Sequence, residues 1–435
     1  MKKTVKNIVL GFLTALARLK LRRLRLFVVG VTGSIGKTST KDALYTILKQ
    51  RYRVYRSKKS FNTEFGMPLA ILEQDSGFSS PLKWMRVLLG ALWNAFVGGR
   101  QMQMLILEMG VDMPGDMDRL LKLVRPQIGV ITNIKPVHLA GGQFKDLDDI
   151  FREKRKLVDS LPEKGIAILN ADDGYLLALK DELKCRMIWY GTSETADLRV
   201  LDLAQTPQGI EFAVSYKGEV VTAAAPVLGA FQIYVLLPAI AASLTQGFTL
   251  EEAAAALKDY RLPPGRMNPI PGIKESLIID SSYNASPEAT KQALDVLADS
   301  VRLAGGGVFA GGAGRRIAVL GNMNELGEGS EQRHREVGRH APGRADVLLT
   351  VGAAAQWIAA EAREAGFSPG AMAHFEDAQA AAEFLKMFVE KHDTILVKGS
   401  QNKVRLERLV KQLMQEPERA GELLVRQGSE WERIV

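Results

Sequence analysis

Short apolar runs rich in β-branched residues alternate with longer stretches of helical periodicity along most of the chain. The first run, residues 26–31 (LFVVGV), is followed by a glycine-containing turn and a helical pattern over residues 37–49. Residues 104–107 and 128–132 form similar runs, which are typical of buried strands. Because buried strands that alternate with helices are typical of parallel sheets, this region is predicted to be α/β with a largely parallel sheet.

A breaker cluster at residues 262–265 (LPPG) interrupts this pattern, which then begins again. Four strand candidates follow, separated by helical stretches, at residues 277–280, 317–320, 347–351 and 394–397. A chain of 435 residues is too long for one ordinary core, so two or three domains are expected. We place a basic segment at 1–25, a central domain at 26–264 and a Rossmann-like α/β domain at 265–435. Residues 305–314 (GGGVFAGGAG) are interpreted as a mobile loop.

The excess of positive charge is concentrated at the start of the chain. The net charge is +8, and residues 1–25 hold eight basic residues and no acidic one. Because the remainder is balanced, a nucleic-acid-binding face is not expected. The apolar run at residues 8–17 is shorter than the about 20 residues that span a bilayer, and it lacks a clear cleavage site. We predict an uncleaved amphipathic helix that lies on anionic lipid or packs on the protein itself.

A second apolar stretch, residues 79–100, carries Trp84 and Trp93. It is predicted to be a helix packed on the core, with a second membrane-facing surface as the alternative. Cys185 is the single cysteine and cannot form an internal disulfide, which fits a reducing cytoplasm. We interpret it as a small buried apolar residue.

The strongest local signal of chemistry is residues 30–39 (GVTGSIGKTS), between a strand and a helix. Such a turn directs backbone N–H groups toward phosphate oxygens, and the helix N-terminus adds partial positive charge. Lys37 would neutralise the β and γ phosphates, and Thr38 would offer its hydroxyl to magnesium. Val31 stands where the strict P-loop has glycine, with Gly30 one residue earlier. An ordinary glycine turn before a helix is the alternative.

This turn matches the TGxxGKT[ST] variant of the Mur ligases, and the chain resembles the D-alanyl-D-alanine-adding branch of that family from about residue 26 onward. The other matching segments are residues 60–72 (SFNTEFGMPLAIL), 105–115 (LILEMGVDMPG), 131–139 (ITNIKPVHL), 150–161 (IFREKRKLVDSL), 165–173 (GIAILNADD), 262–267 (LPPGRM), 278–287 (IIDSSYNASP), 319–334 (VLGNMNELGEGSEQRH) and 393–407 (DTILVKGSQNKVRLE). The resemblance implies a central P-loop ATPase domain followed by a Rossmann-like ligase domain.

The resemblance also implies roles for individual residues. Nucleotide contacts would come from Thr32, Gly33, Ser34, Gly36, Lys37, Thr38, Ser39, Arg266, Asp280, Tyr283 and Asn284. Magnesium ligands would be Thr38, Glu108, His138 and a carbamylated Lys154, and the catalytic set would be Lys37, Glu108, His138 and Lys154. Substrate contacts would come from Asn62, Glu64, Lys398 and Ser400. A carbamate turns a cationic lysine into an anionic oxygen ligand. Taken alone, Glu108 could instead cap a helix, His138 could be a satisfied structural histidine and Lys154 a solvated charge.

The chain departs from the family pattern in several places. Phe231, Gln232 and Val235 replace the HNxxN segment near adenine, Ser281 replaces the second aspartate of DDxYN, and Gln401 replaces the arginine of KGSR, with Arg405 close by. About 25 residues precede the first strand, where the family has a UDP-sugar-binding domain of about a hundred. Either the N-terminal segment and residues 79–100 form a reduced substrate site, or the substrate differs, for example one that is presented at the membrane.

The resemblance implies an ATP- and Mg²⁺-dependent ligase that forms an amide bond through an acyl-phosphate. The expected substrates are small molecules, UDP-N-acetylmuramoyl-tripeptide and D-alanyl-D-alanine, with no nucleic acid. The second domain would close over the nucleotide and exclude water. The expected location is the cytoplasm, with peripheral contact at the inner face of the membrane as an option, and the expected state is a monomer. The alternatives are a folate- or polyglutamate-type relative, which the DSSYNASP and VLGNMNELG stretches disfavour, and a nucleotide-binding scaffold at the membrane.

Overall fold

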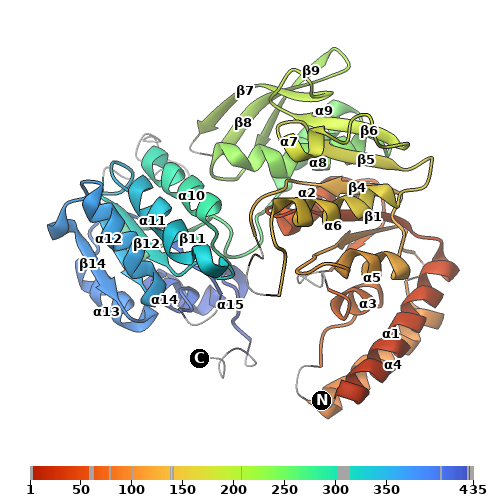
Figure 1. Cartoon of the computed structure of the whole chain (residues 1–435), viewed down its shortest axis with the longest axis horizontal. Helices are drawn as coiled ribbons and strands as arrows, with labels where there is room; N and C mark the ends of the chain where they lie inside the picture. The colour runs from red at the N-terminus through yellow and green to blue at the C-terminus, as the bar shows by residue number, and fades with distance from the viewer. Residues whose placement is uncertain are drawn as a thin grey trace. The chain divides into compact units, whose positions relative to one another are not determined.

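The chain folds into two compact α/β units in the computed structural model (Figure 1). The structure describes residues 3–57, 63–77, 80–99, 101–137, 139, 142–206, 208–300, 314–401, 404–428 and 431. Unit 1 comprises Met1–Asp202, Phe212–Ala224 and Ile233–Tyr260, and unit 2 comprises Leu203–Glu211, Ala225–Gln232 and Arg261–Val435. The predicted fold class, α/β with a mainly parallel central sheet and a second Rossmann-like sheet, is confirmed.

The sheet of unit 1 places the predicted glycine turn at the carboxyl edge of a central strand. Its parallel strands are β1 (Phe27–Thr32), β2 (Val54–Arg56), β3 (Met104–Glu108), β4 (Ile128–Ile131), β5 (Ile166–Asn170) and β6 (Arg186–Gly191). Their order is β2-β3-β1-β4-β5-β6, so β1 lies between β3 and β4. Because the carboxyl ends of parallel strands meet at one edge, residues that follow β1, β3 and β4 gather there.

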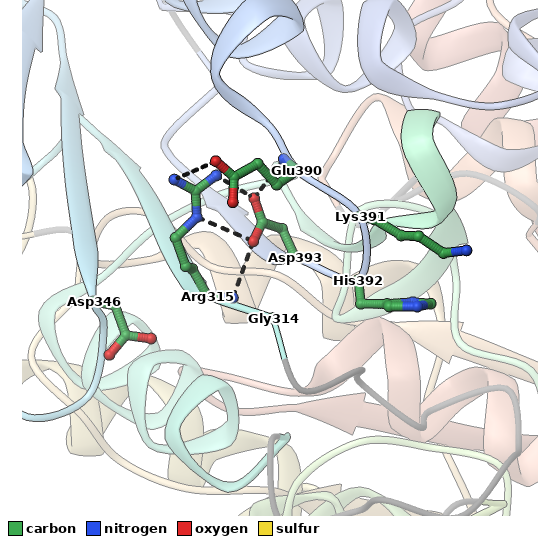
Figure 2. Close-up of a pocket in the computed structure, with 7 residues that line it drawn as sticks. All are labelled: Gly314, Arg315, Asp346, Glu390, Lys391, His392 and Asp393. Atoms are coloured by element: carbon green, nitrogen blue, oxygen red, sulfur yellow. Dashed lines mark hydrogen bonds and ion pairs between the residues drawn. The ribbon is translucent and has the colours of Figure 1, made fainter.

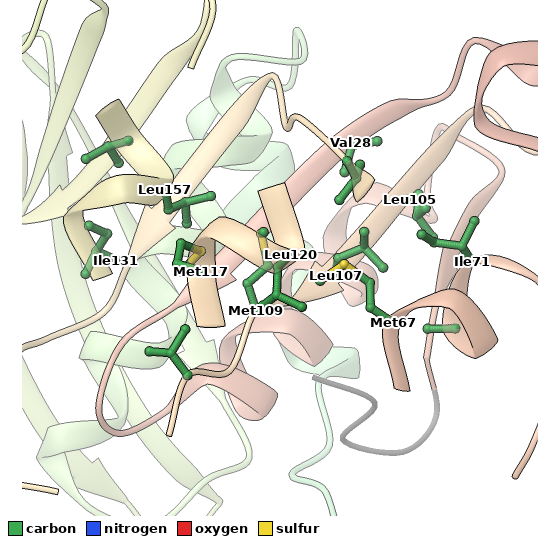
Figure 3. Close-up of a cluster of buried hydrophobic side chains, with 14 of the residues drawn as sticks. Val28, Met67, Ile71, Leu105, Leu107, Met109, Met117, Leu120, Ile131 and Leu157 are labelled. Carbon is green, nitrogen blue, oxygen red and sulfur yellow. The ribbon is translucent and has the colours of Figure 1, made fainter. Parts of the chain in front are cut away.

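Apolar side chains of these strands and of the helices form the core of unit 1. The helices are α1 (Lys3–Leu24), α2 (Lys37–Leu48), α3 (Gly66–Ile71), α4 (Pro81–Phe96), α5 (Asp116–Leu123), α6 (Leu147–Asp159), α7 (Gly174–Leu177), α8 (Ile233–Leu244) and α9 (Leu250–Ala256). Figure 3 shows Leu105 and Leu107 of β3 among buried side chains of α3, α5 and α6, including Met67, Leu120 and Leu157. Each such side chain contributes about 1.5–3 kcal/mol by leaving water.

The sheet continues beyond β6 through three strands that the sequence pattern did not predict. They are β7 (Leu198–Thr206), β8 (Gly209–Tyr216) and β9 (Glu219–Ala225), in that order. Strand β8 buries Ile210, Phe212 and Val214 at alternate positions, as expected of a strand with one covered face. Lys217 and Gly218 both have positive φ in the two-residue turn to β9, so the two strands form a hairpin.

The second sheet contains all four strands predicted for this region. Its strands are β10 (Asn268–Pro271), β11 (Leu277–Ser281), β12 (Arg316–Gly321), β13 (Val347–Val351), β14 (Met372–Phe375) and β15 (Thr394–Lys398). The order is β10-β11-β15-β12-β13-β14; β10 is antiparallel to β11 and the other pairs are parallel. Strand β15 therefore lies between β11 and β12, which brings their carboxyl ends together. The strands β10 and β14 were not predicted.

Among the described residues of this region, six helices connect these strands or follow them. They are α10 (Pro287–Ser300), α11 (Ser330–His340), α12 (Gln356–Glu364), α13 (Ala378–Phe388), α14 (Glu407–Leu413) and α15 (Ala420–Leu423). The predicted glycine-rich loop at 305–314 lies outside the described residues except for Gly314. Cys185 is buried, and burial raises the pKa of its thiol, which confirms its interpretation as a buried apolar residue.

The basic N-terminal helix packs on the protein along one side. Helix α1 buries Leu13, Leu16 and Ala17 in the core of unit 1. The buried Lys20 ammonium pairs with Glu73 at 2.5 Å, which fixes the helix further. The predicted helix and its packing on the protein are therefore confirmed. None of the helices that the structure describes is long and apolar enough to cross a membrane.

Helix α4 lies beside α1 and buries its own side in the same core (Figure 1). Its buried residues Val87, Ala91 and Ala95 follow one another at intervals of four, as expected of a helix with one covered face. The prediction that residues 79–100 form a helix packed on the core is therefore confirmed for the buried side of α4.

Candidate active site

The turn between β1 and α2 adopts a conformation that requires glycine at two positions. Gly33 has φ +140° and Gly36 has φ +86°. A Cβ on Gly33 would lie 1.9 Å from Thr132 Oγ1, so no side chain fits there. Helix α2 begins at Lys37. Its N-cap residue is Gly36, which has no side chain to accept a hydrogen bond from the first N–H groups of the helix. Its first N–H groups therefore form a potential anion site.

Residues from the end of β4 hold this turn in place. The Ile35 N–H donates to Asn133 Oδ1 at 2.9 Å, and the Ser34 hydroxyl donates to the Lys135 carbonyl at 2.9 Å. The hydroxyl of Thr32, a predicted nucleotide contact, donates to the Met109 carbonyl at 2.7 Å. These hydrogen bonds preorganise the turn, which would lower the entropic cost of binding a ligand there.

Thr38 and Glu108, two predicted magnesium ligands, contact each other directly. The Thr38 hydroxyl donates to Glu108 Oε2 at 2.9 Å, and both side chains are buried. The Lys41 Nζ lies 3.7 Å from the same carboxylate oxygen and donates to the Ser57 carbonyl. Sequence reasoning missed Lys41; its position four residues after Lys37, on the same face of α2, was the available signal.

Lys154 has an unusual environment for a lysine. It is fully buried in α6, and its Nζ has no hydrogen-bond partner among the described residues. Burial lowers its pKa well below the ordinary value, and the positive charge of Lys37 lowers it further, while Asp112 and Glu153 partly oppose this. The structure therefore contradicts the alternative that Lys154 is a solvated charge, and it brings Lys154 into the electrostatic range of Lys37.

Lys37 itself is held over the turn that precedes it. Its ammonium donates to the Gly33 carbonyl at 2.8 Å and to the Ser34 carbonyl at 3.0 Å. A phosphate bound at the start of α2 would offer the ammonium a charged acceptor in place of neutral ones, and charge-assisted hydrogen bonds are about twice as strong.

Glu64, a predicted substrate contact of unit 1, has an ion-pair partner outside this cluster. Asn62 and His138 lie outside the described residues. Glu64 is exposed and pairs with Arg119 Nε at 3.3 Å. Its role as a substrate contact stays a prediction.

The segment that departs from the HNxxN pattern contributes a hydrogen bond and a buried apolar side chain to unit 1. The Tyr234 hydroxyl donates to Asp172 Oδ2 at 2.9 Å, a pair that the sequence did not reveal. Backbone N–H groups of Thr192 and Ser193 donate to the same carboxylate. Val235 is buried, and its Cγ2 would lie 3.5 Å from a Cβ on Gly36.

In unit 2, predicted residues gather at the carboxyl ends of β11 and β15. Asp280 is fully buried, burial raises its pKa to about 6, and its Oδ2 has no hydrogen-bond partner among the described residues. The Lys398 ammonium donates to Ser281 Oγ at 3.0 Å and to the Asn284 carbonyl at 3.1 Å. Burial lowers the pKa of Lys398 to about 8, although the Asp280 carboxylate raises it. Ser281, at the place of the family's second aspartate, thus supports Lys398 with a neutral acceptor.

Tyr283 and Ser400 have defined partners next to this pair. The Arg266 guanidinium lies over the Tyr283 ring, 3.8 Å from its centroid, which is a cation–π contact. Arg426 also donates to the Tyr283 carbonyl. The Ser400 hydroxyl donates to the Ala285 carbonyl at 3.2 Å.

Arg405, which lies four residues after Gln401 in the sequence, has a structural role. It is buried, and its Nε lies 2.5 Å from Glu407 Oε1. Arg426 Nη1 lies 3.3 Å from the other oxygen of the same carboxylate. Two cations thus share one buried anion, and Arg405 is held in this cluster.

A pocket of unit 2 lies away from these residues (Figure 2). It is lined by Gly314, Arg315, Asp346, Glu390, Lys391, His392 and Asp393. These residues lie just before β12, β13 and β15, at the amino edge of the sheet, opposite Asp280 and Lys398. Arg315 Nη2 donates to Asp393 Oδ2 at 2.7 Å, so this ion pair joins the starts of β12 and β15. We assign this pocket no role in catalysis.

A glycine turn that presents helix N–H groups, a lysine over the turn and a buried Thr–Glu pair define unit 1 as a phosphate-binding domain of P-loop type. Comparison with known families identifies the chain more closely. Residues 31–243 match the Mur ligase middle domain, and residues 265–401 match the Mur ligase, glutamate ligase domain. The chain belongs to the Mur ligase family. Its identification from sequence as a ligase of this family is confirmed.

Individual relatives are similar over most of their length. The UDP-N-acetylmuramoyl-tripeptide–D-alanyl-D-alanine ligase of Bacillus subtilis is 30% identical over 406 residues, which is 93% of this chain and 79% of that protein. The enzyme of the same name from Escherichia coli is 29% identical over 89% of this chain and 77% of its own. The crystal structure of MurF ligase from Thermotoga maritima in complex with ADP superposes with a TM-score of 0.74 at 27% identity, covering 94% of this chain and 84% of that one.

Proposed function

We propose that this chain joins D-alanyl-D-alanine to UDP-N-acetylmuramoyl-tripeptide in peptidoglycan precursor synthesis, with ATP and Mg²⁺. The observation that carries the proposal is the set of Lys37 and the buried residues Thr38, Glu108 and Lys154 around a glycine turn, in a chain whose curated relatives bear the name of this reaction. We also propose a cytoplasmic location, a monomeric state and the division into segments 1–25, 26–264 and 265–435.

The first step would transfer the γ-phosphoryl group of ATP to the carboxylate of the tripeptide, giving an acyl-phosphate and ADP. Two anions must approach each other in this step, so the site has to offset their repulsion. Lys37 and the N–H groups at the start of α2 supply positive charge and donors for the phosphates. In the second step the amine of D-alanyl-D-alanine would attack the acyl carbon and phosphate would leave.

The donors present fit a magnesium ion. The described residues hold no cluster of three His, Cys, Asp or Glu side chains that could bind a metal without help. Magnesium, however, commonly binds one or two protein oxygens together with the phosphates of its nucleotide. The adjacent Thr38 hydroxyl and Glu108 carboxylate offer such a pair. When bound, the ion would polarise the γ-phosphoryl oxygens and neutralise their charge.

Lys154 fits the proposed carbamate because a neutral amine is the form that reacts with carbon dioxide. The lowered pKa of Lys154 favours the neutral amine, and its Nζ has no hydrogen-bond partner among the described residues that would have to be displaced. A carbamate would also place a negative charge near Lys37, replacing repulsion by attraction. We therefore keep carbamylated Lys154 in the proposed magnesium site, with His138 as a further ligand.

In unit 2, Lys398 and Ser400 are proposed to bind the amine substrate. The buried Lys398 ammonium can bind the carboxylate of a dipeptide, but only while the ammonium is charged. Because its pKa is about 8, that charge is lost within the range of pH in which activity can be measured. Arg266, Asp280, Tyr283 and Asn284 are proposed to contact the nucleotide.

The pKa of Lys398 gives a pH prediction. Below about pH 8 the ammonium is charged, and above it the charge is lost. We expect the KM for D-alanyl-D-alanine to rise about tenfold per pH unit above pH 8, while the KM for ATP changes little. Initial rates between pH 6.5 and 9.5, analysed separately for kcat and KM, measure this. A dipeptide KM that stays flat across the range would contradict the assignment.

The proposed reaction is tested by measuring ADP release with both substrates, with each alone, and with glutamate in place of the dipeptide. Release that requires both UDP-N-acetylmuramoyl-tripeptide and D-alanyl-D-alanine, with the ligated product found by mass spectrometry, supports it. Dependence on glutamate would indicate a polyglutamate-type relative. Slow hydrolysis that is indifferent to any amine would indicate a nucleotide-binding scaffold.

A further inference from the structure

Helices α1 and α4 each expose an apolar stripe on the side away from the core. Along α4, Leu82 is 70%, Leu89 63% and Trp93 64% exposed. Along α1, Ile8 and Phe12 are exposed at the spacing of one helical turn. Single exposed apolar residues are ordinary, but contiguous ones of this size mark an interaction surface. We call these two stripes the α1–α4 face.

The two stripes belong to one surface because the helices run side by side in the same direction. Near their first turns, Lys6 lies over the Phe65 ring while Trp84 packs against the same ring at 5.6 Å. Near their last turns, Arg23 donates to the carbonyls of Phe96 and Asn94. Since both helices bury their other sides in one core, the exposed stripes point away from that core together.

The charge of this face is of one sign. Helices α1 and α4 contain 22 and 16 residues and not a single Asp or Glu. With 49 acidic residues in 435, about four would be expected in these helices at the average frequency. Basic side chains border the stripes instead, and Arg22, Lys83 and Arg86 are exposed. Long basic side chains can lay their apolar stems beside such a stripe and hold their charges at its rim.

We propose that the α1–α4 face docks the enzyme on an anionic lipid surface. The two helices, about 33 and 24 Å long, would lie in the plane of the interface, with their apolar stripes among the acyl chains. Trp93 would lie at the level of the lipid headgroups, where its ring contacts the acyl chains and its N–H can donate to a polar group. The basic rim would contact the lipid phosphates. A protein partner would need an acidic rim around an apolar groove, whereas a lipid bilayer offers both features without any specific shape.

The experiment uses the full chain and sedimentation with phosphatidylcholine vesicles, with or without phosphatidylglycerol. We expect binding to the mixed vesicles, little binding to pure phosphatidylcholine, and a blue shift of tryptophan emission that Trp93→Phe removes. Leu89→Glu with Trp93→Glu should abolish binding. Lys83→Gln and Arg86→Gln should each weaken it roughly fivefold. Met387→Glu is the matched control, because Met387 is 78% exposed on α13 in unit 2; it should bind as the unchanged protein does.

Other outcomes would overturn the proposal. Equal vesicle binding by the Leu89→Glu, Trp93→Glu variant would show that this face is not the contact. A lipid-free dimer that the same variant converts to monomer, without vesicle binding by the unchanged protein, would mean that a second copy covers the face. A raised KM for the UDP-linked substrate, again without vesicle binding, would make it a substrate site. Turnover in lipid-free solution tests the proposed reaction separately, and it should be unchanged in these surface variants.

Discussion

Lys37→Ala is expected to lower the rate of ADP formation by about 10²- to 10³-fold. The ammonium lies over the glycine turn, where it donates to two backbone carbonyls. No other basic side chain on α2 can take its place, because Lys41 is engaged by Ser57 and Glu108 one turn further on. The charge that offsets repulsion between the two reacting anions would therefore be lost without replacement.

The size of this effect is measured by ADP release at saturating substrates, together with the affinity for Mg-ATP. Lys49→Ala is the matched control, since Lys49 follows the same helix and is exposed beside Tyr45. It should leave both quantities within a factor of about two, as surface substitutions usually do. Product formation by Lys37→Ala at the rate of the unchanged protein would exclude the turn from phosphoryl transfer.

The elements around this turn were predictable from sequence because their signals are local. Apolar runs followed by helical periodicity located β1, β3 and β4, and the glycines at 33 and 36 located the turn. The four main strands of unit 2 were found in the same way. A strand that is buried between helices has a nearly continuous run of apolar residues, which an exposed loop does not have.

Strands β7 to β9 were missed for the opposite reason. Their burial alternates, so β8 places Glu211 between the buried residues Ile210 and Phe212 and shows no continuous apolar run. Short alternating segments are easily mistaken for irregular chain. Their position beside β6 depends on pairing across the sheet, which no local pattern encodes.

Contacts between residues that are far apart in the sequence were the other feature that the sequence did not predict. Tyr234 and Asp172 are 62 positions apart, and only the fold brings the hydroxyl to the carboxylate. Arg405 lies close to Gln401 in the sequence, but the sequence does not show that Glu407 holds it in a buried ion pair. Burial of Lys154 likewise follows from the packing of α6 rather than from the charged sequence around it.

That burial leads to the second large effect, which concerns Lys154→Ala. We expect about a 10²-fold loss of ligation, because the variant lacks both the amine and the carboxylate that a carbamate would supply. Acetate or formate should restore part of the activity, since the truncated side chain leaves a buried space near Lys37 in which a small carboxylate is attracted. Arg152→Ala, an exposed cation on the same helix, is the control and should need no rescue.

The carbamate itself can be observed in the unchanged protein. After exchange into ¹³C-bicarbonate, we expect one slow-exchanging carbamate signal in the ¹³C spectrum that is absent from Lys154→Ala. Removing carbon dioxide should lower activity, and adding bicarbonate should restore it. The sign follows from the lowered pKa: acidification protonates the amine and favours loss of the carbamate, so the dependence on bicarbonate should become steeper as the pH falls. Full activity without carbon dioxide, together with no signal, would show that Lys154 carries no carbamate and would remove it from the proposed magnesium site.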